Sequence, residues 1–166
     1  MKQYPFVLQE RREWCVPVSL YIVLSSRGIR APSQRDIADI LGVGKNGFND
    51  DLERIDLFLK RFGLKGRHTH PKMVFEGGDY FLKENLPRED IIAIYNHIDL
   101  IFPVRDEERR KAGKHFALVL DYQEMGDRVW LHDAGEGRML DAPLGRLTMA
   151  MQLHEDSRYG FYVIGN

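Results

Sequence analysis

The chain contains a single cysteine, Cys15, at the point where a charged lead-in gives way to an apolar run. The run continues to Leu24 and, if it is helical, Cys15 stands at its N-terminus. Unpaired backbone N–H groups and the helix dipole at such a position favour a thiolate. One interpretation of Cys15 is therefore a reactive nucleophile. The other is an inert core thiol among valines and leucines, which is the commoner state of a lone cysteine.

A histidine and an aspartate later in the chain could activate this thiol. His115 opens an apolar segment that continues to Leu120, and Asp133 follows a second such segment, residues 129–132. Two paired strands would bring both side chains to one edge of a sheet. In chain order the sequence then supplies a thiol, an imidazole to take its proton and a carboxylate to orient the imidazole.

Gln9 adds a possible donor for developing negative charge. It stands six residues before Cys15, so its amide could fold back toward the sulfur. Together with the backbone N–H of Cys15 it would stabilise the oxyanion of a tetrahedral intermediate. The candidate catalytic residues are therefore Cys15, His115, Asp133 and Gln9.

The first element that must position these residues is a helix from Cys15 to about Ser26. Pro17 is tolerated in a first helical turn, and Gly28 supplies a left-handed stop after the run. The segment is apolar nearly all round, which predicts a helix buried inside a domain.

Two further helices are expected in the first part of the chain. Ser33 caps the second, with Asp36 three residues on and Gly42 at its end, and Asn49 caps the third, which ends at Gly63. Apolar residues at helical spacing predict that both helices pack on a core, without implying a cofactor: Ile37, Ile40 and Leu41 in the second, and Leu52, Ile55, Phe58, Leu59 and Phe62 in the third.

After Gly63 the apolar runs become short and β-branched or aromatic, and turn residues separate them. This pattern predicts strands at residues 91–95, 115–122, 129–132 and 159–164, with a hairpin turn at residues 125–127. Short helices are expected at residues 79–86 and 144–153, the latter with Leu144, Leu147, Thr148 and Met151 inward. Helices first and an antiparallel sheet second predict an α+β fold. No repeat or linker interrupts the chain, so residues 1–166 are expected to form one domain.

Composition excludes several classes of partner. Lys plus Arg is 24 and Asp plus Glu is 25, a formal net charge of −1, so neither nucleic acid nor an anionic membrane is an expected partner. One cysteine excludes an intramolecular disulfide and the usual thiolate zinc sites. The N-terminus lacks a signal-peptide core and no stretch approaches about 20 apolar residues. A cytoplasmic protein without a membrane segment is expected; export by another route and the oligomeric state stay open.

These motifs resemble those of papain-like cysteine peptidases. The resemblance is carried by Gln9 before Cys15 at the head of a helix, by Gly113-Lys114-His115-Phe116-Ala117-Leu118-Val119, and by Val129-Trp130-Leu131-His132-Asp133 before a glycine turn. Within that superfamily the chain is most similar to the bacteriocin-processing peptidases, which cleave leader peptides after a double glycine. Gly28-Ile29 and residues 33–38 also follow the first helix as they do in that family, and the likeness spans about residues 7–164.

The resemblance implies a papain-like fold, with N-terminal helices packed on a C-terminal antiparallel sheet, and hydrolysis of a peptide bond. In that activity Cys15 attacks the carbonyl, His115 shuttles the proton, Asp133 orients His115 and Gln9 stabilises the oxyanion. The implied substrate is a peptide or protein cut after a glycine-containing site, and no cofactor or metal is required. Two alternatives are an acyl or amide transferase using the same triad and a degenerate domain that binds a peptide without cutting it.

The chain departs from that family beside two of its catalytic positions. Val16-Pro17 follows the cysteine where the family usually has glycine, and a bulkier residue there would reshape the oxyanion region. Ala134 follows the carboxylate where the family often has proline. Family members are commonly fused to a transporter, so the substrate is the least constrained part of the resemblance. Gly77-Gly78 is expected to be a plain turn before a helix, not a self-processing site.

Four other polar residues have the chemistry of metal ligands. His68 and His70 would share one face of a strand, and His97 or Asp79 could complete a set of ligands. No cysteine or HExxH-like partner accompanies them, so no metal site is predicted.

The remaining conspicuous residues have structural interpretations. His132 alternates with Asp133 and should face the other side of the sheet. Trp14 either anchors the start of the first helix in the core or walls a substrate groove. The charged run at residues 105–111 mixes signs and predicts a solvated loop, with a role as an active-site flap left open.

Overall fold

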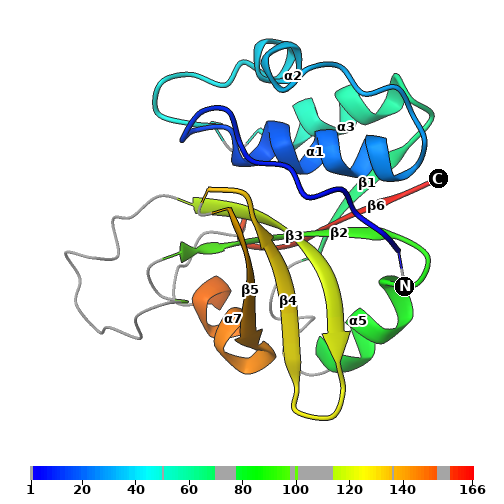
Figure 1. Ribbon diagram of the computed structural model, residues 1–166, viewed down its shortest axis with the longest axis vertical. Coiled ribbons are helices and arrows are strands. Elements are labelled where there is room, and N and C mark those ends of the chain that lie inside the picture. The colour runs from blue at the N-terminus through cyan, green and yellow to red at the C-terminus, as the bar shows by residue number, and fades with distance from the viewer. Residues whose placement is uncertain are drawn as a thin grey trace.

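The computed structural model describes residues 2–49, 51–69, 78–97, 100, 114–135, 137–152 and 158–166. One helical layer lies on one face of a curved antiparallel sheet, and further helices lie on the other (Figure 1). The elements in chain order are α1 Cys15–Ser26, α2 Gln34–Leu41, α3 Leu52–Lys60, β1 Lys65–Thr69, α5 Gly78–Asn85, β2 Asp90–Asn96, β3 Lys114–Gln123, β4 Arg128–Asp133, β5 Arg138–Pro143, α7 Leu144–Gln152 and β6 Gly160–Gly165. This arrangement confirms the predicted α+β class.

The strands form one six-stranded sheet in the order β1-β6-β2-β3-β4-β5, and every described pairing is antiparallel. The four predicted strands and the hairpin turn between β3 and β4 are confirmed. Strands β1 and β5 were not predicted. Both lie at the edges of the sheet, where one side of the strand is unpaired and polar residues, Gly66 and Pro143 are tolerated.

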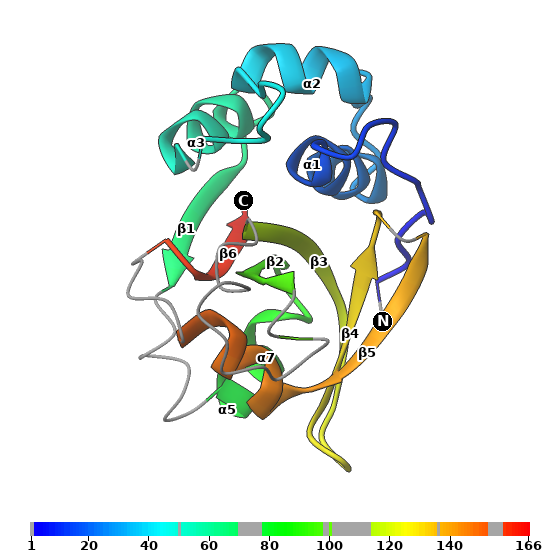
Figure 2. The ribbon, with the colours of Figure 1, turned by 90° about the vertical axis from the view of Figure 1, so that its left-hand side faces the viewer.

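Helix α1 lies between α2 and the sheet, whereas α3 lies beside it and packs directly on β1 (Figure 2). Its apolar side chains are inaccessible to solvent: Val16, Val18, Leu20, Ile22, Val23 and Leu24. Burying each such side chain is worth about 1.5–3 kcal/mol, which fixes the helix against the sheet. The helix ends as predicted, because Gly28 adopts a φ of 70° and Ile29 N donates to Leu24 O. The start of α1 is therefore held rigidly over the sheet.

Helices α2 and α3 confirm most of their predicted features. Ser33 and Asp36 form a reciprocal capping box, and Gly42 closes α2 with a φ of 68°. Ile40 was expected to face the core but is 38% exposed; Ala38 is buried instead. Asn49 is not the cap of α3, because the helix begins at Leu52 with Asp51 at its N-cap position.

The central strands bury both of their faces. Along β2, Ile92 and Ile94 face the core beneath α1, whereas Ile91, Ala93 and Tyr95 face a second core beneath α5 and α7. Helix α7 covers that second core with four residues that were predicted to point inward: Leu144, Leu147, Thr148 and Met151. No helix in the described ranges is both long and apolar enough to cross a membrane.

Candidate active site

Cys15 is the first residue of α1 and carries a free, half-buried thiol. The turn before it is closed by Trp14 N, which donates to Arg11 O at 3.0 Å. Trp14 is 8% exposed, with the Arg11 guanidinium 5.2 Å from its ring centroid, so it anchors the start of the helix in the core. Because Pro17 has no N–H, the backbone donors of the first turn are those of Cys15 and Val16.

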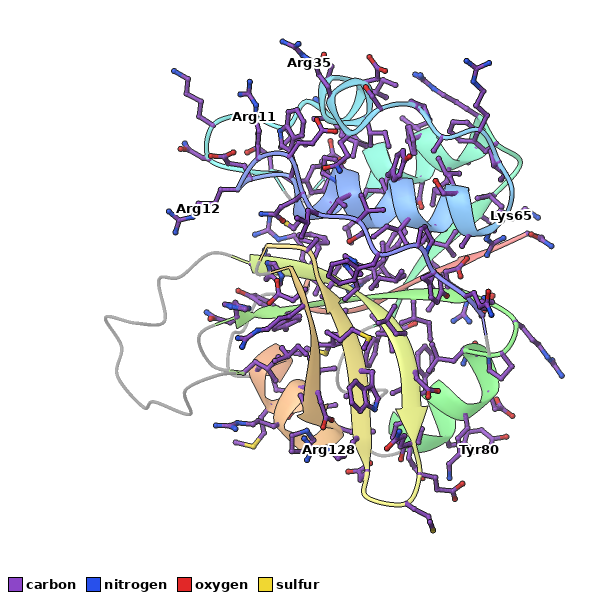
Figure 3. The ribbon with its side chains drawn as sticks, viewed as in Figure 1. Arg11, Arg12, Arg35, Lys65, Tyr80 and Arg128 are labelled. Carbon is purple, nitrogen blue, oxygen red and sulfur yellow. The ribbon has the colours of Figure 1, made fainter. Side chains whose placement is uncertain are left out.

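The thiol opens into a cavity of about 470 Å³ between the helical layer and the sheet. His115 lines the opposite wall from the start of β3. Arg12 lies at the mouth, on the loop before α1, and points outward (Figure 3). The complete lining is Arg12, Glu13, Cys15, Lys45, Asn46, Gly47, Phe48, Lys114, His115 and Phe116.

Val16 does not line this cavity. Its side chain is fully buried in the core beneath α1, so its bulk points away from the thiol's surroundings. The glycine that the resemblance leads one to expect is thus replaced by a residue whose extra atoms lie in the core.

Asp133 lies behind His115, at the end of the neighbouring strand β4. His115 Nε2 is 3.6 Å from Asp133 Oδ1, and the Asp133 side chain is only 1% exposed. Gly135 N donates to the same oxygen at 3.1 Å, which fixes the carboxylate in the turn after β4. With Nε2 facing Asp133, the other ring nitrogen of His115 is left for Cys15.

The surroundings of His115 favour its protonated form. Burial, the largest single influence, lowers its pKa, but hydrogen bonding to Asp133 and Cys15 and the negative charges of both partners outweigh burial and raise the pKa to about 9. The site therefore stabilises the protonated His115 ring between Cys15 and Asp133.

Gln9 lies beside the turn that holds Asp133. Its backbone N donates to Ala134 O at 3.2 Å, and its side-chain Nε2 donates to Arg12 O at 2.9 Å. The Gln9 amide also lies against Gly135, where its Nε2 is 3.3 Å from the position that a Cβ would occupy. All four residues predicted for the site thus come from segments that meet at one end of the strands β3 and β4.

Gln34 was not predicted to take part in the site, yet its side chain holds the backbone on both sides of Gln9. It is buried at the start of α2, where its Oε1 accepts from Glu10 N at 3.0 Å and its Nε2 donates to Leu8 O at 2.8 Å. A polar residue in the first turn of a helix gives no sequence signal for such a long-range clamp.

His132 is structural, as predicted. It is 3% exposed, its Nε2 accepts from Val7 N at 3.3 Å, and the Phe6 ring centroid is 5.0 Å away. Burial lowers its pKa, which keeps the ring neutral and able to accept.

His97 is a second imidazole beside Asp133. Its Nδ1 is 4.0 Å from Asp133 Oδ2, and its ring centroid is 4.9 Å from that of His115. The sequence pointed to His97 only as a partner of His68 and His70. Tyr95 pairs with His115 across β2 and β3, and His97 follows Tyr95 by two residues. The sequence alone does not contain this strand register, so it could not place His97 beside His115.

Several predictions fall outside the part of the chain that the structure describes. These concern His70, Gly77 and the charged run at residues 105–111, and they stay predictions. Within the described part, the group of side chains close enough to share a metal ion is His97, His115 and Asp133, which includes neither His68 nor Asp79.

A thiol at the start of a central helix, facing an imidazole and a carboxylate on an antiparallel sheet, defines the papain-like class of fold. No protein-family model and no curated protein matches the sequence. Two solved structures are similar to the chain with a TM-score of 0.62. One is a double-glycine motif protease from an AMS/PCAT transporter in complex with the leader peptide, 15% identical, with 99% of this chain and 91% of that chain covered. The other is the peptidase domain of Streptococcus ComA, a bifunctional ABC transporter involved in a quorum-sensing pathway, 14% identical, with 99% and 98% covered.

The chain therefore has the papain-like fold of double-glycine peptidase domains over nearly its whole length. This confirms the resemblance at the level of the fold. At such low identity the likeness does not by itself carry over an activity, which rests on the residues of the site.

Proposed function

We propose that the protein is a cysteine peptidase that cuts a peptide or protein through a thioester on Cys15. His115 transfers the proton, Asp133 orients His115 and Gln9 helps to stabilise the oxyanion. We assign these roles to a single domain of residues 1–166 acting in the cytoplasm. The observation that carries the proposal is the placement of Cys15 and His115 on the walls of one cavity, with Asp133 Oδ1 3.6 Å from His115 Nε2.

In the proposed reaction His115 takes the proton of the Cys15 thiol, and the resulting thiolate is the nucleophile. Cys15 Sγ forms a bond to the carbonyl carbon, and the carbonyl oxygen takes the negative charge. His115 then gives its proton to the leaving amine as the C–N bond breaks, which leaves a thioester. A water molecule, deprotonated by His115, attacks the thioester, releases the acid and restores the thiolate.

Gln9 can serve the oxyanion without giving up the contact that positions it. A side-chain amide has two N–H donors, and one of those on Nε2 is used by Arg12 O. We assign the second to the oxyanion, together with the Cys15 backbone N–H, as a pair of the kind that oxyanion holes use.

Val16-Pro17, which stands where the family usually has glycine, would favour a domain that binds a peptide without cutting it if Val16 narrowed the oxyanion region. Because the Val16 side chain is fully buried in the core, it leaves the cavity beside Cys15 open. Pro17 is likewise buried within the first turn of α1. An accessible thiol beside a charged imidazole supports a catalytic site over a site that only binds.

The fold suggests the kind of substrate. One structural neighbour is a double-glycine motif protease solved with a leader peptide, so we propose that this chain cuts after a glycine-containing site. A peptide library with and without glycine pairs, analysed by mass spectrometry, tests this. The wild-type protein should release free carboxylic acids, and Cys15→Ala should lower the rate by at least about 10³-fold.

Two results would contradict the proposal. Cleavage by Cys15→Ala at the wild-type rate would exclude Cys15 as the nucleophile. Amides as the main products in the presence of an added primary amine, in place of acids, would show a transferase acting through the same thioester.

A further inference from the structure

His97 takes no part in the proposed reaction, yet it faces the carboxylate on which the reaction depends. Its Nδ1 is 4.0 Å from Asp133 Oδ2, and His115 Nε2 is 3.6 Å from Asp133 Oδ1. One ligand atom from each of the three residues lies within 4.8 Å of the other two. The fold brings them together because β2, β3 and β4 are neighbouring antiparallel strands. His97 follows the end of β2, His115 lies near the start of β3 and Asp133 ends β4, so all three lie at the same end of these strands.

Two imidazole nitrogens and one carboxylate oxygen are a donor set typical of Zn²⁺ and similar ions. Around a tetrahedral ion with bonds of about 2.0–2.2 Å, neighbouring ligand atoms lie about 3.3–3.6 Å apart. The observed separations are 3.6 and 4.0 Å, each to a different oxygen of Asp133, and the three ligand atoms all lie within 4.8 Å of one another. Binding an ion therefore needs the side chains to approach by about 1.5 Å at most. His97 is 26% exposed, which gives an ion a route from solvent, whereas Asp133 is fully enclosed.

We propose that His97, His115 and Asp133 bind one divalent transition-metal ion, with Zn²⁺ as the test ion, and that the bound ion switches the catalytic site off. His115 Nε2 cannot ligate a metal and at the same time donate a hydrogen bond to Asp133. Metal binding therefore separates the carboxylate from the imidazole that it orients. The inhibitory part rests on the proposed function, whereas the binding itself does not.

The site is distinct from capture of metal by the thiol. Cys15 lies on the other side of the His115 ring from Asp133, since Nε2 faces the carboxylate. The fourth position of the ion is left for water.

Zinc titration of the full-length Cys15→Ala protein by calorimetry tests the binding, because this variant removes the competing thiol. One Zn²⁺ per chain is expected to bind. Adding His97→Gln should weaken the affinity by more than about tenfold, the scale seen even for groups that only support a ligand. His68→Gln, a histidine on the opposite edge strand β1, is the matched control and should leave the affinity unchanged.

The absence of zinc binding to Cys15→Ala would overturn the proposal, as would equal affinity in Cys15→Ala and its His97→Gln derivative. Circular dichroism of each variant shows whether it is folded, and His97→Asn provides a second variant if His97→Gln is not.

Alkylation of Cys15 by iodoacetamide tests the inhibitory part. Saturating Zn²⁺ should slow alkylation of the wild-type protein at least tenfold, a chelator should restore it, and His97→Gln should resist the effect. Equal slowing in both proteins would mean that the metal binds the thiolate directly, which contradicts the proposal. If the zinc-free wild-type protein had no peptidase activity but zinc binding depended on His97 as expected, only the proposed function and the inhibitory part would be overturned.

Discussion

His115 is the residue whose protonation the site controls most strongly. Its neighbours Asp133 and Cys15 raise its pKa to about 9 against the opposing effect of burial. A folded-state pKa above the ordinary 6.5 means that the folded protein holds this proton more tightly than the unfolded chain does. The resulting stability is present in full below about pH 6.5 and is lost as pH rises through about 9; it is on the order of 3 kcal/mol at most.

We expect the His115 ring to titrate near pH 9 in the wild-type protein, measured by NMR of labelled histidine. Asp133→Asn removes one of the partners that raise the pKa, so the midpoint should fall. A midpoint near 6.5 in the wild-type protein, or one unaffected by Asp133→Asn, would show that the imidazolium is not held by these partners.

Gln9→Ala separates oxyanion stabilisation from thiol activation. Loss of one oxyanion donor should lower the rate of peptide cleavage by about 10²–10³-fold. Alkylation of Cys15 by iodoacetamide passes through no oxyanion and should keep its rate. Gln123→Ala, at the exposed end of β3, is the matched control and should change neither rate. If Gln9→Ala slowed both reactions equally, Gln9 would be a structural residue.

The residues of the proposed site could be found in the sequence because each of them marks a change in local pattern. Cys15 begins an apolar run, His115 is the second residue of β3 and Asp133 is the last residue of β4. His97 and Gln34 could not be found in this way. Their roles depend on which strands pair and on which helix meets the N-terminal segment, and both are long-range facts that local patterns do not contain.

At the scale of single elements, the two caps of α2 and α3 make a matched comparison. Ser33 accepts from Asp36 N and completes a capping box, whereas the Asp51 side chain makes no capping hydrogen bond. Ser33→Ala should therefore lower the free energy of unfolding by about 1 kcal/mol, measured by urea denaturation. Asp51→Ala removes only an exposed contact with Arg54 and should cost less than about 0.5 kcal/mol. Equal losses would contradict the assigned caps.

Elements with strong local signals were predicted well, and those without them were not. Helix α1 has both its apolar run and its stop, so its bounds were predicted closely. Strand β1, whose sequence is Lys-Gly-Arg-His-Thr, forms because β6 offers it a partner. Strand β5 similarly depends on β4. Edge strands of this kind are determined by pairing more than by their own composition.

At the scale of the whole molecule, Asp90 joins distant parts of the chain. Its carboxylate is fully buried at the start of β2 and accepts from Tyr4 Oη at 2.6 Å, Arg27 Nε at 2.6 Å and Lys2 Nζ at 3.1 Å. Arg27, just after α1, also donates to Ile164 O and Asn166 Oδ1 near the C-terminus. The buried carboxylate thus fixes the N-terminal segment and the end of α1 to the sheet.

Asp90→Ala should lower the free energy of unfolding by about 3–5 kcal/mol, because it leaves the half-buried Arg27 without its carboxylate. Urea denaturation measures this loss. Asp141→Ala breaks the exposed Arg128–Asp141 ion pair and should cost less than about 1 kcal/mol. A loss of that small size for Asp90→Ala would show that the network does not hold the termini.

The class of fold could be predicted from the order of its elements, since helices precede strands. The burial of both faces of the sheet could not be predicted. Alternate residues of β2 belong to two different cores, and this division depends on helices packing on both faces of the sheet. The catalytic proposal depends on this arrangement, because it holds the start of α1 near the start of β3 and the end of β4.

The most direct test of that proposal is the rate at which iodoacetamide alkylates Cys15 at pH 6, in the wild-type protein and in His115→Ala. The thiolate–imidazolium pair predicts rapid alkylation of the wild-type protein at this pH and a rate at least tenfold lower in His115→Ala. Equal, slow alkylation of the two proteins, as for an ordinary thiol, would contradict it.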